Sequence, residues 1–127
     1  MTAPSAQRFV PMLHVAQVPR AVAFYATFGF AIGNAHYEPS CGDDPVWVSL
    51  QSPGGAELML VLADGPVDDT VQAVLFYVYC DDVAAMRERV LAAGIDAGAM
   101  AYPFYRPKGE FRVRDPDGYV LMVTHHD

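Results

Sequence analysis

The sequence predicts an α+β fold assembled from two copies of one unit. A β-hairpin pattern occurs twice, at 48–61 and 111–124, and its turns SPGG and DPDG begin at Ser52 and Asp115, 63 residues apart (115 − 52 = 63). In each turn proline presets one φ angle and glycine accepts a positive φ. A helical pattern precedes each hairpin at nearly the same interval. Each unit therefore reads strand, helix, strand, strand, strand, abbreviated βαβββ.

The first unit begins with a strand at 9–15. Pro11 cannot donate a ladder hydrogen bond, so this strand is expected at a sheet edge or a junction. A helix follows from Val18, with Pro19 in its first turn and Gly29 as its stop signal. The later strands of this unit are expected at 30–37, 46–51 and 56–62.

The second unit follows a linker rich in Asp, Gly and Pro at 63–72. A strand is expected at 73–80, and Asp81 is the expected N-cap of the second helix. The apolar face of that helix consists of Val83, Met86, Val90 and Leu91. A short strand near Ile95 and a loop with several aromatic residues lead into the repeated hairpin.

Neither unit can cover both faces of a four-stranded sheet by itself. We therefore predict one domain over 1–127, with module 1 at 8–62, the linker at 63–72 and module 2 at 73–125. The two modules are expected to form a curved eight-stranded mixed sheet. The helices cover its convex face, and its concave face forms a ligand cleft.

Strand alternation sorts the side chains onto two faces of this sheet. The face expected under the helices is apolar throughout: Phe9, Pro11, Leu13, Val15, Val48, Leu50, Leu58, Leu60, Val74, Phe76, Val78, Phe111, Val113, Tyr119, Leu121 and Val123. The opposite face mixes aromatic, apolar and ionisable residues: Val10, Met12, His14, Trp47, Ser49, Gln51, Glu57, Met59, Val61, Leu75, Tyr77, Tyr79, Glu110, Arg112, Arg114, Val120, Met122 and Thr124. Such a mixture is typical of a small-molecule cleft.

The composition narrows the possible partners. Apolar residues make up 53% of the chain, enough for a core, and the net charge of −7 argues against nucleic acid, which requires a basic surface. No apolar run is long enough to span a membrane, and the first residues lack the apolar core of a signal peptide. Cys41 and Cys80 form neither a disulfide framework nor a metal motif, so we expect a cytoplasmic protein.

Three segments resemble the vicinal oxygen chelate superfamily, which includes glyoxalase I, extradiol dioxygenases and bleomycin-resistance proteins. These segments are LHVAQVPRAVAFYATFGF, YVYCDDVAAMRERVLAAGI and EFRVRDPDGYVLMV. The resemblance covers nearly the whole chain and implies paired βαβββ modules. It also implies a homodimer in which two modules enclose each ligand site.

Metal-dependent members of that superfamily carry ligands on the first and last strands of each module. The matching positions here are Val10, Met59, Leu75 and Met122. None of them supplies a carboxylate oxygen or an imidazole nitrogen, so no metal or other cofactor is expected. The sequence thus resembles the metal-free bleomycin-resistance branch, whose members bind and sequester a molecule and can confer antibiotic resistance.

His14 and Glu57 are the two candidate catalytic residues, as an acid/base pair or as part of an atypical metal shell. The alternative is that they only contact the ligand or solvent. Glu110, Arg112 and Arg114 alternate along one strand, either to recognise an anionic group or to form a cross-strand charge network. The full set of expected ligand contacts is His14, Trp47, Glu57, Met59, Tyr77, Tyr79, Phe104, Tyr105, Glu110, Arg112 and Met122.

Three functions are compatible with these observations. The preferred one is a non-catalytic small-molecule binder with an aromatic cleft, because planar side chains stack on planar or cationic groups. The second is a metal-dependent lyase, isomerase or dioxygenase built around His14 and Glu57. The third is a structural or regulatory domain whose cleft is filled by its own side chains. Phe104 and Tyr105, in a loop bounded by prolines, serve either as a lid or in a dimer interface.

Overall fold

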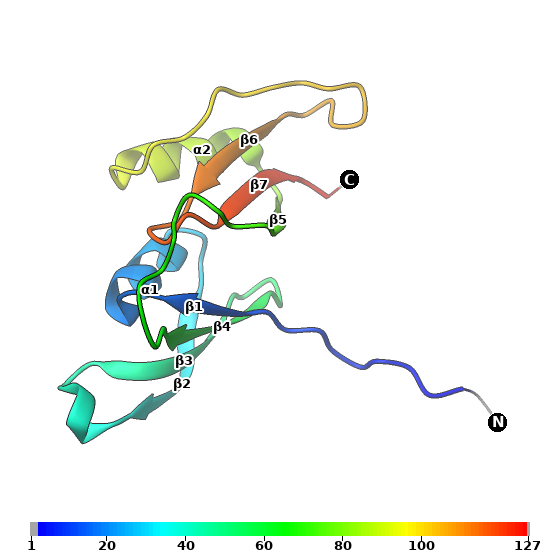
Figure 1. Cartoon of the computed structure of the whole chain (residues 1–127). Helices are drawn as coiled ribbons and strands as arrows, with labels where there is room; N and C mark the ends of the chain where they lie inside the picture. Colours follow the sequence, from blue (N-terminus) through cyan, green and yellow to red (C-terminus); the bar gives the residue numbers. More distant parts are fainter. Residues whose placement is uncertain (1–2, 127) are drawn as a thin grey trace.

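The structure, a computed structural model, describes residues 3–126. Within these residues, two α-helices and seven β-strands follow one another, and the last two strands form the second hairpin (Figure 1). Both helices lie on the same side of the strands, and the segment before β1 extends away from the body of the molecule (Figure 1). The elements are β1 (Met12–Val15), α1 (Val18–Ala26), β2 (Ala31–Tyr37), the 3-10 turn η1 (Pro39–Cys41), β3 (Pro45–Gln51), β4 (Glu57–Leu62), β5 (Leu75–Cys80), α2 (Val83–Ala92), β6 (Glu110–Arg114) and β7 (Val120–His125).

Module 1 forms a four-stranded sheet with the order β1-β4-β3-β2. β1 pairs with β4 in parallel, with Met12 opposite Met59, and β3 pairs with β4 in antiparallel fashion around the first repeated turn. β1 is shorter than expected and begins at Met12, because Pro11 has no N–H to donate to the ladder. As predicted, this strand lies at the edge of its sheet.

Module 2 forms a three-stranded sheet with the order β5-β7-β6. The fourth strand, expected near Ile95, is reduced among the described residues to two isolated bridges, Ala97 to Val113 and Ala101 to Glu110. Pro103 lies two residues after Ala101 and cannot donate a ladder hydrogen bond, so the pairing does not continue beyond this point.

The prediction of a single eight-stranded sheet is wrong, because the two modules form separate sheets. The two edge strands that would have joined them, β1 and β5, do not pair. A cavity of about 470 Å³ lies between the modules, lined by Leu13 of β1 and by Phe76 and Val78 of β5.

The buried core contains most of the face that was predicted to lie under the helices. Leu50, Leu60, Phe111 and Val123 are almost completely buried and belong to one cluster with the apolar residues of both helices. Phe9 and Val74 are exceptions, since both are exposed and lie outside the strands. The alternation rule failed at these two positions because it applies only within a strand.

The helices begin and end near the predicted positions. The N-cap of α2 is Asp82 and not Asp81, because the Asp82 side chain accepts a hydrogen bond from the Ala85 N–H at 3.0 Å. Gly29 and Gly94, which follow the two helices, both have positive φ angles. No helix in the described part of the chain combines the length and apolar character needed to cross a membrane.

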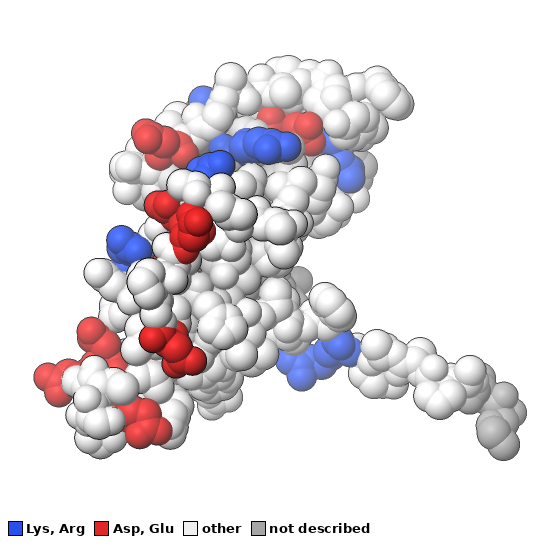
Figure 2. Space-filling view, in the orientation of Figure 1, with Lys and Arg blue, Asp and Glu red and all other residues white. Residues whose placement is uncertain are grey.

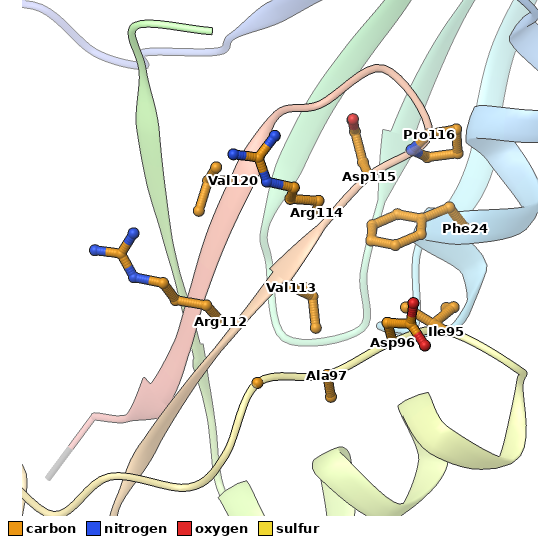
Figure 3. Close-up of a pocket in the computed structure, with 11 residues that line it drawn as sticks. Phe24, Ile95, Asp96, Ala97, Arg112, Val113, Arg114, Asp115, Pro116 and Val120 are labelled. Carbon is orange, nitrogen blue, oxygen red and sulfur yellow. The ribbon is translucent and has the colours of Figure 1, made fainter. Parts of the chain in front are cut away.

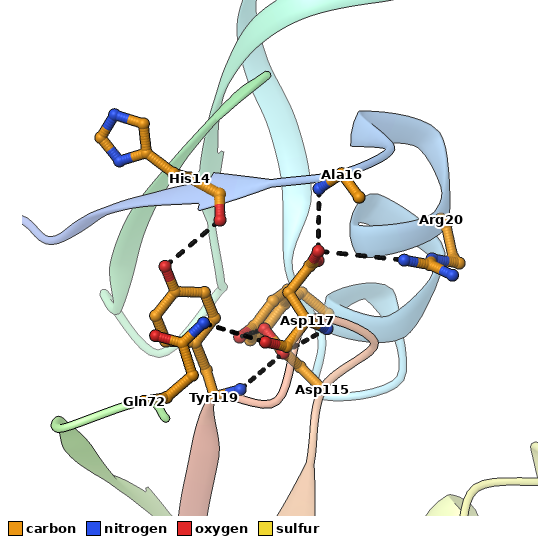
Figure 4. Close-up of polar contacts among 8 residues, drawn as sticks. His14, Ala16, Arg20, Gln72, Asp115, Asp117 and Tyr119 are labelled. Carbon is orange, nitrogen blue, oxygen red and sulfur yellow. Dashed lines mark hydrogen bonds and ion pairs between the residues drawn. The ribbon is translucent and has the colours of Figure 1, made fainter. Parts of the chain in front are cut away.

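The turn between β6 and β7 connects module 2 to α1 and to the end of β1 through hydrogen bonds (Figure 4). The Tyr25 hydroxyl donates a buried hydrogen bond of 2.6 Å to Asp115, and the Ala16 N–H donates one of 2.8 Å to Asp117. Tyr119 reaches back across the junction and donates to the His14 carbonyl at 3.2 Å. Burial is the main cause that raises the pKa of both Tyr25 and Asp115. The second repeated turn therefore sets the relative placement of the two modules.

Candidate ligand-binding site

On module 1, the sheet face opposite the helices contains a hollow of about 300 Å³. Trp47, Glu57 and Met59 line it, together with Val10 and with Arg8, a residue that the sequence had not suggested. Three of the predicted ligand contacts are thus brought together on adjacent strands β3 and β4.

The Glu57 side chain forms an ion pair with Arg8, which lies in the segment before β1. The Arg8 guanidinium donates two hydrogen bonds to the Glu57 carboxylate, one of them from Nε to Oε2 at 2.9 Å. This pairing holds the pKa of the Glu57 carboxyl below its ordinary value. A carboxylate with a lowered pKa is a weaker base, so the geometry does not favour Glu57 for proton abstraction.

His14 and Glu57 do not form a pair. His14 lies opposite Val61 in the β1–β4 register, four residues along β4 from Glu57 (61 − 57 = 4). At about 3.3 Å per residue this places the two side chains roughly 13 Å apart. The expected acid/base pair or metal shell built on both residues is therefore not assembled within this chain.

On module 2, the face opposite the helices is organised in rows across the sheet. One row is Tyr77, Met122 and Arg112, and the next is Tyr79, Thr124 and Glu110. The rings of Tyr77 and Tyr79 are stacked with centroids 6.0 Å apart and planes inclined by 26°. The Arg106 guanidinium lies over the Tyr79 ring, 5.5 Å from its centroid, and extends the stack of planar groups.

The basic residues of β6 gather on the same face as this stack. Figure 2 shows Lys and Arg side chains over β6 with acidic side chains beside them. Arg112 is exposed, and among the described residues no ion pair joins it to Glu110, so the expected charge network does not form between them. Arg114 donates to the Asp69 carbonyl at 3.3 Å.

A groove of about 640 Å³ runs along the edge of β6. Figure 3 shows Arg112 and Arg114 on one side of that strand, pointing away from Phe24 and Ile95. The groove is therefore divided between the two faces of the sheet, and only its Arg112 side belongs to the face with the tyrosine stack.

The inter-module cavity of about 470 Å³ brings residues of both modules together. Glu57, Tyr77 and Tyr79 line it, all three predicted as ligand contacts. Phe28, Phe30 and Phe76 complete an aromatic wall that the sequence did not indicate, because their positions read as ordinary core residues. The volume and the largely apolar lining with few polar groups are those of a small-molecule site.

The loop with Phe104 and Tyr105 projects from module 2. Phe104 is 95% exposed, and its ring contacts that of Tyr105 edge-to-face with centroids 5.3 Å apart. Neither residue lines the inter-module cavity. Within one chain this loop does not cover that cavity.

The residues at the superfamily metal positions do not fit a hard divalent cation. Val10, Met59, Leu75 and Met122 offer hydrocarbon and thioether groups in place of the oxygen and nitrogen donors that such metals require. Among residues 3–126, no group of three or more His, Cys, Asp or Glu side chains is close enough to hold a metal ion.

Two related modules, βαβββ in the first and βαββ in the second, with a cavity between them define a class of small α+β proteins. The sequence model of the Glyoxalase/Bleomycin resistance protein/Dioxygenase superfamily matches residues 9–123, and the chain belongs to this family. The comparison with curated proteins finds no match.

Solved structures share this fold over almost the entire chain. A bleomycin resistance determinant encoded on transposon Tn5 is 20% identical with a TM-score of 0.74, and the alignment covers 96% of this chain and 99% of that one. The bleomycin-binding protein of the producer Streptomyces verticillus, complexed with copper(II)-bleomycin, is 20% identical with a TM-score of 0.68, covering 98% and 100%. An antibiotic-binding protein from another Streptomyces is 23% identical with a TM-score of 0.68, covering 100% and 99%.

Proposed function

We propose that this protein binds a planar aromatic small molecule in the inter-module cavity, without transforming it chemically. The observation that carries the proposal is the cavity of about 470 Å³ between the modules, whose lining includes Tyr77, Tyr79, Phe28 and Phe76. Aromatic side chains in the lining favour a flat aromatic ligand, because stacked rings gain attraction beyond the burial of area. Similar solved structures of antibiotic-binding proteins support the binding of a small molecule.

The binding test uses metal-free bleomycin together with a neutral naphthyl carboxamide and its amidine analogue. Isothermal titration calorimetry measures the affinity of each probe for the wild type and for Tyr77→Ala. We expect at least one probe to bind, and the substitution to weaken binding about tenfold, since an aromatic contact contributes about 0.5–1.5 kcal/mol beyond its buried area.

Tyr37→Ala is the matched control for this test. Tyr37 is exposed to a similar extent but lies on β2, away from the cavity. The control should leave the affinity unchanged. Failure of all three probes to bind, or equal weakening by both substitutions, would overturn the proposed site.

We also propose that the protein forms a homodimer and that its ligand site is completed by the partner. Exposed apolar side chains support this proposal: Phe9, Ile32, Leu75 and Phe104 are all uncovered in the single chain. Apolar area of this kind is typical of interaction surfaces. Light scattering should give twice the 13.8 kDa chain mass, about 27.6 kDa (2 × 13.8), and a mass of one chain would contradict the proposal.

The alternative function is a metal-dependent reaction of the same superfamily. Elemental analysis of protein purified without chelator distinguishes the two functions. About one divalent ion per chain would overturn the proposal that the ligand is bound without being transformed, whereas the absence of metal together with probe binding would support it.

We further propose a reducing, cytoplasmic location, consistent with Cys41 and Cys80 being free thiols.

A further inference from the structure

The hollow on module 1 has a chemical character that the proposed function does not use. Among the described residues that line it, Glu57 is the only acidic side chain and Arg8 the only basic one. Its volume is about 300 Å³, and Trp47 adds the face of an indole ring to the lining. The hollow and the inter-module cavity share only Glu57 and Leu58, so the two spaces lie on different sides of the start of β4.

Arg8 reaches Glu57 from a segment that is joined loosely to the sheet. In the described chain, residues 3–10 form no backbone hydrogen bond, and the first such bond runs from the Met59 N–H to the Pro11 carbonyl at 2.9 Å. The Arg8 side chain is 67% exposed and that of Glu57 is 29% exposed. A solvent-exposed ion pair of this kind adds little to stability, so another cation can replace Arg8 at small cost.

The geometry of the ion pair shows which kind of cation fits. Two nitrogens of the planar Arg8 guanidinium donate to the two oxygens of the Glu57 carboxylate, with Nε to Oε2 at 2.9 Å. An amidinium or guanidinium group offers the same pair of parallel N–H donors, and such two-point contacts are among the stronger hydrogen bonds of proteins. The pair therefore demonstrates that a planar cation is accommodated at this carboxylate.

The remainder of the hollow extends from Glu57 towards Trp47. Trp47 lies opposite Val61, four residues along β4 from Glu57 (61 − 57 = 4), which separates the two backbone positions by roughly 13 Å. Ser49 and Met59 form the directly paired couple between them. A molecule with a cationic end at Glu57 can thus place a planar group against the indole ring, which attracts planar and cationic groups.

We propose that the module 1 hollow is a second binding site, specific for an elongated organic cation. The amidinium or guanidinium end of the ligand pairs with Glu57, and its planar body extends towards Trp47. Arg8 of the same chain competes for the carboxylate and so weakens the binding of every cation at this position. The net charge of −7 favours the approach of such a ligand.

The test follows a signal that belongs to this site. Trp47 is the only tryptophan of the chain, so its indole N–H gives a single signal in nitrogen-15 NMR spectra and reports on the hollow. A naphthyl amidine and the neutral naphthyl carboxamide of the same shape are titrated separately. We expect the amidine to shift this signal saturably in the wild type, with an affinity at least about tenfold higher than that of the carboxamide.

Two substitutions that break the same ion pair should act in opposite directions. Arg8→Ala removes the competitor and should raise the affinity for the amidine about two- to fivefold. Glu57→Gln removes the anchor and should lower it at least about tenfold, and the double variant should behave like Glu57→Gln. The matched control is Glu38→Gln, which removes an exposed glutamate of the same module that is paired with His36 and should leave the affinity unchanged.

The outcomes decide between a binding role and a structural role for the pair. If Arg8 and Glu57 only stabilise the fold, both single variants change the amidine affinity in the same direction or leave it unchanged, and the proposal is overturned. It is also overturned if the amidine does not shift the Trp47 signal in the wild type and Arg8→Ala, or if its preference over the carboxamide survives Glu57→Gln. None of these results affects binding in the inter-module cavity, which the Tyr77→Ala titration tests by itself.

Discussion

Tyr25→Phe removes one buried hydrogen bond between the modules and no carbon atom. Tyr25 is 3% exposed and Asp115 is 4% exposed, and the O–H···O distance between them is 2.6 Å. The substitution leaves the aromatic packing of the Tyr25 ring against Phe24 and Phe30 in place. The change in stability therefore reports on the polar contact.

The expected loss of stability in Tyr25→Phe depends on which hydrogen bonds the Asp115 carboxylate keeps. Its Oδ1 atom still accepts hydrogen bonds from the N–H groups of Asp117 and Tyr119, both at 2.9 Å, whereas Oδ2 loses the Tyr25 hydroxyl. A hydrogen bond to a charged group contributes about 1.5–3 kcal/mol, so we expect the free energy of unfolding to fall by about 2 kcal/mol. With a urea m-value of about 1–3 kcal/mol per molar, the midpoint should fall by roughly 1 M.

Urea unfolding followed by circular dichroism measures this difference. Tyr119→Phe is the matched control, because its hydroxyl contacts the His14 carbonyl at 3.2 Å and is exposed. That variant should lose less than about 1 kcal/mol, the typical net contribution of a neutral hydrogen bond. A loss for Tyr25→Phe no larger than that for Tyr119→Phe would refute the reasoning that the buried contact fastens the modules.

Three further predictions concern stability. Burial raises the pKa of Asp115 above its ordinary value of 3.8, so the native state holds the carboxyl proton more tightly than the unfolded state does. The free energy of unfolding of the wild type should therefore fall, relative to that of Asp115→Asn, as the pH rises through the native pKa of Asp115. Urea unfolding of both proteins from pH 3.5 to 8 tests this, and a difference that does not change with pH would contradict it. Leu60→Ala, at a fully buried position, should cost about 2–5 kcal/mol in urea unfolding, and a cost below 1 kcal/mol would count against its place in the core. Gly118→Ala should be more destabilising in the same assay than Gly55→Ala: both glycines have positive φ, but only a Cβ at Gly118 would overlap a backbone oxygen, that of Asp69.

The repeated turn and the alternating strands could be read without a structure because both are local. Proline fixes φ and glycine permits a positive φ wherever they occur, so the DPDG turn and its earlier copy could be predicted from the sequence. Alternation assigns a residue to a face whenever the strand is real, which is why Leu60 and Phe111 were correctly placed in the core. The family match over residues 9–123 confirms the resemblance inferred from the same segments.

The assembly of the modules depended on contacts that no local pattern encodes. The Tyr25–Asp115 and Ala16–Asp117 hydrogen bonds, which connect the modules, join residues 90 and 101 positions apart in the chain. The same applies to the pairing of Glu57 with Arg8 and to the distance between Glu57 and His14.

By itself, then, the sequence determined the family, the repetition of a unit with a strand, a helix and a hairpin, and the face on which the residues of these strands lie, since these follow from backbone preferences over a few residues. Only the tertiary structure decided that the sheets remain separate, that aromatic residues of both modules line one cavity, and that the Glu110 side chain is buried. These features depend on the packing of distant segments, where burial and unsatisfied hydrogen bonds are properties of the assembled chain.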